Sequence, residues 1–234
     1  MAKDLKQIIA DEYVKCAKDP IHFMRKYCKI QHPTRGKINF DLYPFQEKAL
    51  TQFAEHDYSV ILKSRQLGIS TLTAGVTLWS MVFNQDFNAL VIAIKQDTAK
   101  NLVTKIRVMH EFLPSWLKGK ILEDNKLSLR LANGSQVKAV SSSPDAGRSE
   151  ALSLLVIDEA AFIDGIDDIW TSAQQTLATG GKCIALSTPN GVGNWFHKTW
   201  VKAESGENKF NTIRLHWTVH PERTKPGETS KILY

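Results

Sequence analysis

The sequence is poor in the features that mark secreted, membrane-spanning and zinc-binding proteins. Its 234 residues include three cysteines, Cys16, Cys28 and Cys183, and seven histidines, and neither type recurs at the spacing of a zinc site. So few cysteines favour a reducing compartment over a disulfide scaffold. No apolar run approaches the roughly 20 residues of a membrane span, and the N-terminus lacks a signal-peptide core. We therefore expect a cytoplasmic protein without a membrane anchor.

The composition is that of an ordinary folded domain. Hydrophobic residues make up 43% of the chain and charged residues 23%, which excludes a disordered chain. The formal net charge is +6. Such a modest basic excess permits nucleic-acid binding but does not establish it.

The hydrophobic pattern divides the chain into three parts. Residues 1–40 have an amphipathic helical pattern, and we expect a small N-terminal helical cap or lid segment there. Residues 41–217 alternate short apolar runs with helical stretches, which predicts an α/β core with a mainly parallel sheet flanked by helices. Asn133-Gly134 predicts a hairpin inserted in this core or added at its edge. Residues 218–234 are polar and predict a linker.

The turn after the first apolar run resembles a phosphate-binding loop. In the pattern GxxxxGK[ST], Gly68 takes the second glycine and Ser70 the Mg²⁺-binding hydroxyl. Lys63 stands where the first glycine is expected, and Ile69 stands where the lysine is expected. Lys63 and Arg65 are the nearest cations that could neutralise the phosphates instead. A plain strand–turn–helix with surface cations explains this turn about as well.

Two later strands end in residues suited to phosphate chemistry. The run 154–157 is followed by Asp158, which could ligate Mg²⁺, and Glu159, which could polarise an attacking water. The run 182–186 is followed by Ser187, Thr188 and Asn190, which could sense a γ-phosphate or could be simple turn residues.

Upstream of these motifs, Tyr43 and Gln46 could recognise a nucleotide base. A tyrosine ring can stack on adenine, and a glutamine amide can read the edge of the base. The alternative is an aromatic staple at the start of a helix.

Together, the ordered motifs YPFQ, SRQLGIST, LLVIDEAA and STPNG resemble the ATPase domain of the large terminase subunit, the DNA-packaging motor of tailed bacteriophages. The resemblance implies a P-loop NTPase fold of the additional-strand, catalytic-glutamate type. It implies ATP and Mg²⁺ as ligands, with Tyr43 and Gln46 as the adenine motif. It further implies a Walker A loop formed by Lys63, Ser64, Arg65, Gln66, Leu67, Gly68, Ile69, Ser70 and Thr71.

The same resemblance assigns the remaining roles. Ser70 and Asp158 become metal ligands and Glu159 the catalytic base, while Ser187, Thr188 and Asn190 form the coupling motif. Lys63 becomes a displaced Walker A lysine, and Arg65 a γ-phosphate contact. Arg148 matches an arginine that reaches the ATP of a neighbouring subunit.

The function implied is ATP hydrolysis that drives double-stranded DNA into a procapsid. The implied partners are DNA, the portal of the procapsid, the small terminase subunit and further copies of this chain in a ring, although the isolated domain could be monomeric. We expect residence in the host cytoplasm with transient docking on the procapsid. Residues 218–234 would lead towards a C-terminal nuclease domain that this chain lacks, so nuclease activity is not expected.

Two other functions remain open from the sequence. A helicase-like ATPase would normally continue into a second motor domain. A nucleotide-binding module that does not hydrolyse ATP would be consistent with Ile69 in place of the lysine, whereas Glu159 argues against it.

Overall fold

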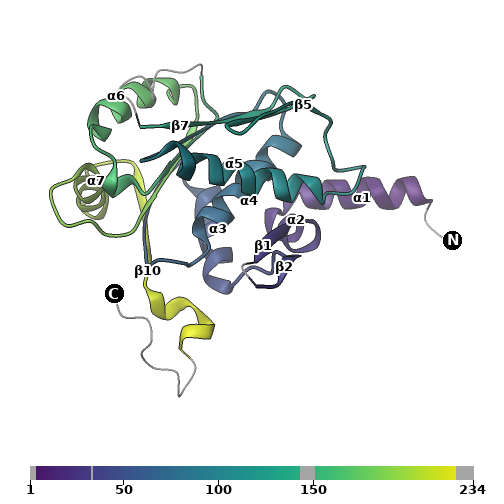
Figure 1. Ribbon diagram of the computed structural model, residues 1–234, viewed down its shortest axis with the longest axis horizontal. Coiled ribbons are helices and arrows are strands. Elements are labelled where there is room, and N and C mark those ends of the chain that lie inside the picture. Colours follow the sequence, from purple (N-terminus) through teal and green to yellow (C-terminus); the bar gives the residue numbers. More distant parts are fainter. Residues whose placement is uncertain (1–3, 33, 143–150, 225–234) are drawn as a thin grey trace.

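The computed structural model describes residues 4–32, 34–142 and 151–224, and its centre is an eight-stranded sheet (Figure 1). The strand order is β10-β3-β9-β8-β4-β7-β6-β5. Six neighbouring strands run parallel, and two antiparallel strands extend one edge. The parallel strands are β3 (Tyr58–Lys63), β4 (Asn88–Ala93), β7 (Gln136–Ser141), β8 (Leu154–Asp158), β9 (Lys182–Ser187) and β10 (Phe210–Leu215). The α/β prediction is confirmed.

Helices cover both faces of the sheet, because its central strands are apolar on both sides. In β8, Leu154 and Val156 pack in one core, and Leu155 and Ile157 in the other. The first core lies under α3 (Pro44–Glu55), α4 (Ile69–Phe83) and α5 (Gln96–Glu111). The second lies under η1 (Ala160–Phe162), α6 (Ile166–Thr176) and α7 (Trp195–Glu204). Continuous apolar runs are therefore what this sheet requires.

The order of the strands places β9 between β3 and β8. The strand before the phosphate-loop candidate and the strand before the acidic pair are thus separated by one additional strand, as the resemblance implied. The predicted hairpin is also present: β6 (Ser128–Leu131) pairs antiparallel with β7 across Asn133-Gly134, and β5 (Ile121–Asp124) extends that edge.

The N-terminal part differs from the expected all-helical cap. Helices α1 (Leu5–Lys18) and α2 (Pro20–Tyr27) are followed by a two-stranded hairpin of β1 (Lys29–His32) and β2 (Gly36–Asn39). Gly36 has φ +69°, a left-handed conformation suited to the turn between these strands. A helix over all of residues 1–40 was therefore a wrong prediction for the last quarter of the segment.

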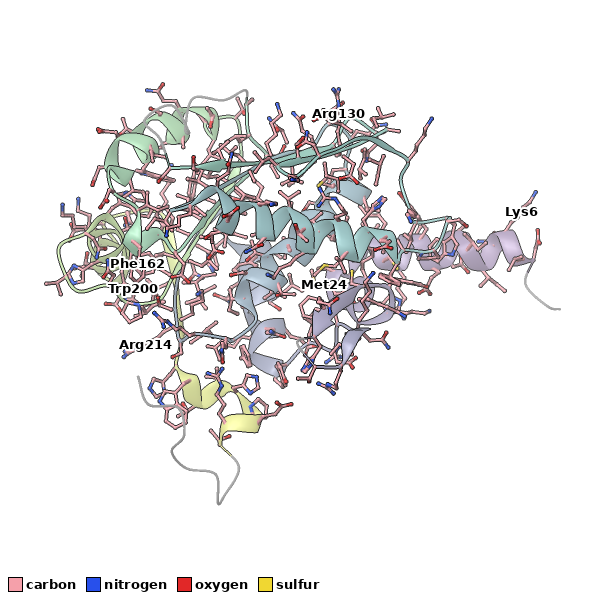
Figure 2. All side chains as sticks on the ribbon, viewed as in Figure 1. Lys6, Met24, Arg130, Phe162, Trp200 and Arg214 are labelled. Atoms are coloured by element: carbon pink, nitrogen blue, oxygen red, sulfur yellow. The ribbon has the colours of Figure 1, made fainter. Side chains whose placement is uncertain are left out.

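This N-terminal part packs on the main domain. Met24 of α2 is buried (Figure 2), and a Cβ added at Gly75 of α4 would lie 2.9 Å from its sulfur. The indole nitrogen of Trp79 donates to the carbonyl of Cys16 at 2.9 Å. In contrast, the first turns of α1 project away from the body, with Lys6 near the tip (Figure 2).

At the other end, the chain folds back after β10. It forms two short 3₁₀ turns, η2 (Trp217–Val219) and η3 (Pro221–Arg223), beside the start of α3. Thus the first residues of the expected linker are ordered against the core. Across the described ranges, no helix is both long and apolar enough to cross a bilayer.

Candidate functional site

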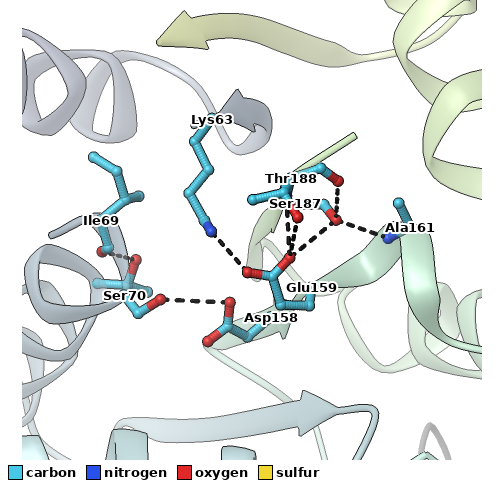
Figure 3. Close-up of polar contacts among 9 residues, drawn as sticks. Lys63, Ile69, Ser70, Asp158, Glu159, Ala161, Ser187 and Thr188 are labelled. Atoms are coloured by element: carbon cyan, nitrogen blue, oxygen red, sulfur yellow. Dashed lines mark hydrogen bonds and ion pairs between the residues drawn. The ribbon is translucent and has the colours of Figure 1, made fainter. Parts of the chain in front are cut away.

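The residues singled out from the sequence meet at one edge of the sheet. Strands β3, β9 and β8 are neighbours and parallel, so their carboxyl ends lie side by side. The phosphate-loop candidate follows β3, the acidic pair ends β8, and the hydroxyl motif ends β9 (Figure 3). Such an edge is where ligands bind in parallel α/β sheets.

The turn between β3 and α4 has the backbone of an anion-binding loop. Gln66 and Gly68 both adopt left-handed conformations, with φ of +59° and +71°. Gly68 is the residue before α4, whose first N–H groups have no partner within the helix and carry the positive end of its dipole. A phosphate at this turn would satisfy those groups.

Gln46 supports this turn from α3. Its buried amide, 3% exposed, donates to the carbonyl of Leu67 at 3.0 Å and accepts from the backbone N–H of Tyr43 at 3.0 Å. A Cβ at Gly68 would lie 2.6 Å from the same amide nitrogen. Here the Gln46 amide holds the turn, and its role as a reader of adenine stays a prediction.

Tyr43 is packed between other rings. The Phe45 ring stacks on it with centroids 5.6 Å apart, and the His220 ring lies 4.6 Å away. Its hydroxyl donates to Glu222 at 3.1 Å. Stacking of Tyr43 on adenine also stays a prediction, and it would require one of these rings to move.

The central contact is between Lys63 and Glu159. The Nζ of Lys63, a residue only 7% exposed, lies 2.8 Å from Oε1 of Glu159 (Figure 3). Partial burial alone would raise the pKa of Glu159. The hydrogen bond and charge of Lys63, with hydrogen bonds from Thr188, outweigh that effect and hold the pKa below its ordinary value. Glu159 is therefore ionised at neutral pH, as a general base must be.

The hydroxyl motif holds the other oxygen of Glu159. Thr188 donates both its backbone N–H and its Oγ1 to Oε2 at 3.1 Å, and Ser187 Oγ lies 3.4 Å away. Ser187 also accepts from the backbone N–H of Ala161, whose carbonyl accepts from Asn190. The three predicted coupling residues thus contact Glu159 and η1.

Glu159 itself has φ +53°, a costly conformation for a non-glycine residue. It is held there by contacts from β3 and β9 on opposite sides of its carboxylate. The strain and the contacts together fix the direction in which the carboxylate points.

Asp158 and Ser70 form the candidate metal pair. Ser70 Oγ donates to Oδ1 of Asp158 at 3.5 Å, and Asp158 is 6% exposed. Burial raises the pKa of Asp158, an effect that Lys63 partly offsets. Carboxylate and hydroxyl oxygens suit Mg²⁺, and a divalent cation would favour the charged form of this buried carboxylate. The donor set therefore fits the expected ion.

The other residues of the turn have different surroundings. Ile69 is 1% exposed and packs in the core under α4, so this position does not present a side chain to the site. Leu67 is also buried in that core, whereas Arg65 is exposed. The backbone of Ser64 continues the sheet by donating to Leu215 at 2.9 Å. Thr71 lines a shallow cavity between α5 and β1.

Two aspects of the site were not accessible from the sequence. Arg148 lies outside the described residues. Conversely, His220, Glu222 and Arg223 contact the Tyr43 motif and the turn, although their polar, proline-containing segment predicted only a linker. Nothing in that segment signals these contacts.

Comparison with known proteins identifies one matching family. The sequence model of the terminase large subunit family, T4-like-virus type, N-terminal part, matches residues 60–227. This range contains the turn, the acidic pair and the hydroxyl motif.

Three similar solved structures share the fold. The large terminase ATPase domain of Thermus phage P74-26 has a TM-score of 0.61 at 22% identity, covering 79% of this chain and 85% of that one. The large terminase of bacteriophage HK97 gives 0.64 at 18%, covering 86% and 43%. A large terminase from a thermophilic bacteriophage in complex with ADP gives 0.60 at 16%, covering 76% and 46%. The chain therefore spans less than half of the two longer proteins.

Proposed function

The chain belongs to the terminase large subunit family, and we propose that it binds ATP with Mg²⁺ and hydrolyses it to drive double-stranded DNA into a procapsid. The observation that carries this proposal is the position of Glu159. Its carboxylate is ionised, fixed by Lys63 and Thr188, and adjacent to the Asp158–Ser70 pair at the end of the parallel strands. A related terminase was solved in complex with ADP, which supports nucleotide binding at this fold.

Each residue type fits a step of phosphoryl transfer to water. The N–H groups of the turn and the start of α4 would hold the phosphates, and Glu159 would orient and deprotonate the attacking water. Ser70 and Asp158 would hold Mg²⁺, which supplies positive charge to the phosphate oxygens. Lys63 is the cation best placed to stabilise the transferred group, because it already lies beside Glu159.

The hydroxyl motif would transmit the state of Glu159 to the rest of the domain. Thr188 and Ser187 contact its carboxylate, and Asn190 bonds to Ala161 and, through its carbonyl, to Asn194 at the start of α7. A change at Glu159 would therefore reach η1 and α7 directly. This path is consistent with a motor that converts hydrolysis into movement.

DNA and the packaging partners belong to the same proposal. Of four candidate DNA contacts on or beside α5, Arg107 is already paired with Asp124 at 2.6 Å, which leaves Lys95, Lys100 and Lys105. We propose the portal, the small terminase subunit and further copies of this chain as protein partners, with Arg148 acting between copies. The site of action would be a procapsid in the host cytoplasm.

The decisive experiment measures ATP binding and steady-state hydrolysis by the purified domain, with and without duplex DNA, for the wild type and Glu159→Gln. Binding by both proteins with hydrolysis only by the wild type supports the proposal. Binding without hydrolysis by the wild type would instead identify a nucleotide-binding module. DNA-driven packaging into purified procapsids then tests translocation.

A further inference from the structure

The segment after β10 contacts both sides of the proposed nucleotide site. His220 and Glu222 contact Tyr43, and Arg223 contacts the turn between β3 and α4. These partners lie about 160 to 180 residues earlier in the chain. Three neighbouring side chains thus join two motifs that are otherwise separated by α3 and β3.

The contact of Arg223 is with the backbone of the turn. Its Nη1 donates to the carbonyl of Arg65 at 3.1 Å, and its Nη2 donates to the carbonyl of Gln66 at 3.2 Å. Nη2 also approaches the side-chain oxygen of Gln66 at 3.4 Å. A guanidinium can serve two adjacent acceptors at once because its donors form a rigid planar fork.

These two carbonyls determine the geometry of the turn. Gln66 has φ +59° without being a glycine, so the turn holds a conformation that its sequence disfavours. In a loop that binds an anion through its N–H groups, the carbonyls must point away from the anion and find donors elsewhere. Arg223 supplies such donors, and charge-assisted hydrogen bonds are the stronger kind.

We propose that Arg223 is a positioning residue for nucleotide binding, which fixes the phosphate-binding turn by holding the carbonyls of Arg65 and Gln66. This inference rests on the proposed ATPase function. Arg223 acts through the turn, so its loss weakens the affinity for the phosphates more than it slows the chemical step. Arg65, by contrast, is proposed to contact the γ-phosphate itself.

The neighbouring Glu222 anchors the same segment. Its carboxylate accepts from the hydroxyl of Tyr43, the residue before α3, while Gln46 from the first turn of α3 holds the carbonyl of Leu67. The turn is therefore held by Gln46 from one side and Arg223 from the other. Movement of the segment after β10 would release one of these two supports.

The test compares Arg223→Ala and Arg223→Lys with Arg214→Ala. Arg214 lies nearby on β10, is exposed, and forms no ion pair with any described residue, so it controls for the lost charge (Figure 2). Calorimetry with ADP and excess Mg²⁺ gives the affinity, ATPase assays give KM and kcat, and thermal melting without nucleotide reports folding.

For Arg223→Ala we expect ADP affinity to fall about tenfold and KM to rise similarly, as for the loss of one charge-assisted hydrogen bond, with kcat changed by less than about threefold. Arg223→Lys keeps the charge but not the fork, so its affinity falls by about half as much on a logarithmic scale. Arg214→Ala behaves as the wild type.

Wild-type ADP affinity in Arg223→Ala, or in Arg223→Lys, would overturn the inference. So would an equal loss in Arg214→Ala. If Arg223→Ala does not fold, Arg223→Lys decides alone. A wild type that neither binds ADP nor hydrolyses ATP refutes the proposed function together with this inference, whereas a wild type that does both, with Arg223→Ala unchanged, refutes only the role of Arg223.

Discussion

The ammonium group of Lys63 lies 2.8 Å from Oε1 of Glu159, and the two residues end strands that are separated by β9. The cation proposed to replace the Walker A lysine is therefore bound to the proposed catalytic base. A phosphate at the turn would compete with Glu159 for this cation. The pair joins nucleotide binding and water activation through one contact.

Glu159→Gln should bind ATP nearly as well as the wild type but turn it over about 10²–10⁴ times more slowly. A glutamine keeps the shape and can still accept the Thr188 hydrogen bonds, yet it cannot take a proton from water. Calorimetry and single-turnover assays separate the two effects. A parallel loss of binding and rate would mean that Glu159 is structural.

Lys63→Ala should slow hydrolysis by about 10²–10³, because it removes a positive charge directed at the reacting group. It should also change the pH profile. Lys63 favours the ionised form of Glu159, so its removal raises the pKa of that carboxyl and moves the acid limb of kcat to higher pH. Lys63→Arg, which retains the charge, is the matched control, and an unmoved acid limb in Lys63→Ala would contradict the contact.

Thr188→Val should reduce kcat about tenfold, which corresponds to about 1.4 kcal/mol of lost support for the Glu159 carboxylate. The side chain is buried and valine has nearly the same shape, so the change removes chiefly the hydroxyl. Thr188→Ser keeps that hydroxyl and should remain close to the wild type. Equal rates for the serine and valine variants would show that the Oγ1 contact is dispensable.

Gly68→Ala should destabilise the domain more than Gly165→Ala. Both glycines have φ near +70°, and alanine in that conformation costs about 1–2 kcal/mol. Only at Gly68 would the added Cβ meet the Gln46 amide, displacing a hydrogen bond worth about 1 kcal/mol. Urea unfolding of both variants measures the difference. In a Gln46→Ala background the difference should disappear, and its persistence would show that the contact is not the cause.

Glu12 predicts an acid-sensitive contact between the two N-terminal helices. Hydrogen bonds from Lys26 and His22 lower the pKa of Glu12 to about 2. Because this pKa is lower in the folded chain, the stabilisation is complete above about pH 4.5 and is lost as the pH falls towards 2. Glu12→Gln should flatten the dependence of the unfolding midpoint on pH over this range. Glu204→Gln, at the exposed end of α7, should leave it unchanged.

Local sequence predicted the elements that carry the site. Apolar runs such as 154–157 identified the strands, and the acids, glycine and hydroxyls at their ends identified the edge where they meet. These signals are local because a strand buried on both faces needs a continuous apolar run, whatever its neighbours are. The hairpin at Asn133-Gly134 was predicted for the same reason, since the turn residues themselves favour it.

By itself, then, the sequence determined the fold class, the strands and the chemical groups at their ends. The tertiary structure decided which groups meet: Lys63 with Glu159, Gln46 with the turn, and Arg223 with carbonyls some 160 residues earlier. It also decided that Ile69 faces the core and that residues 29–39 form a hairpin. The physical reason is that periodicity and turn chemistry act over a few residues, whereas these contacts depend on the order of the strands and the path of the chain between them.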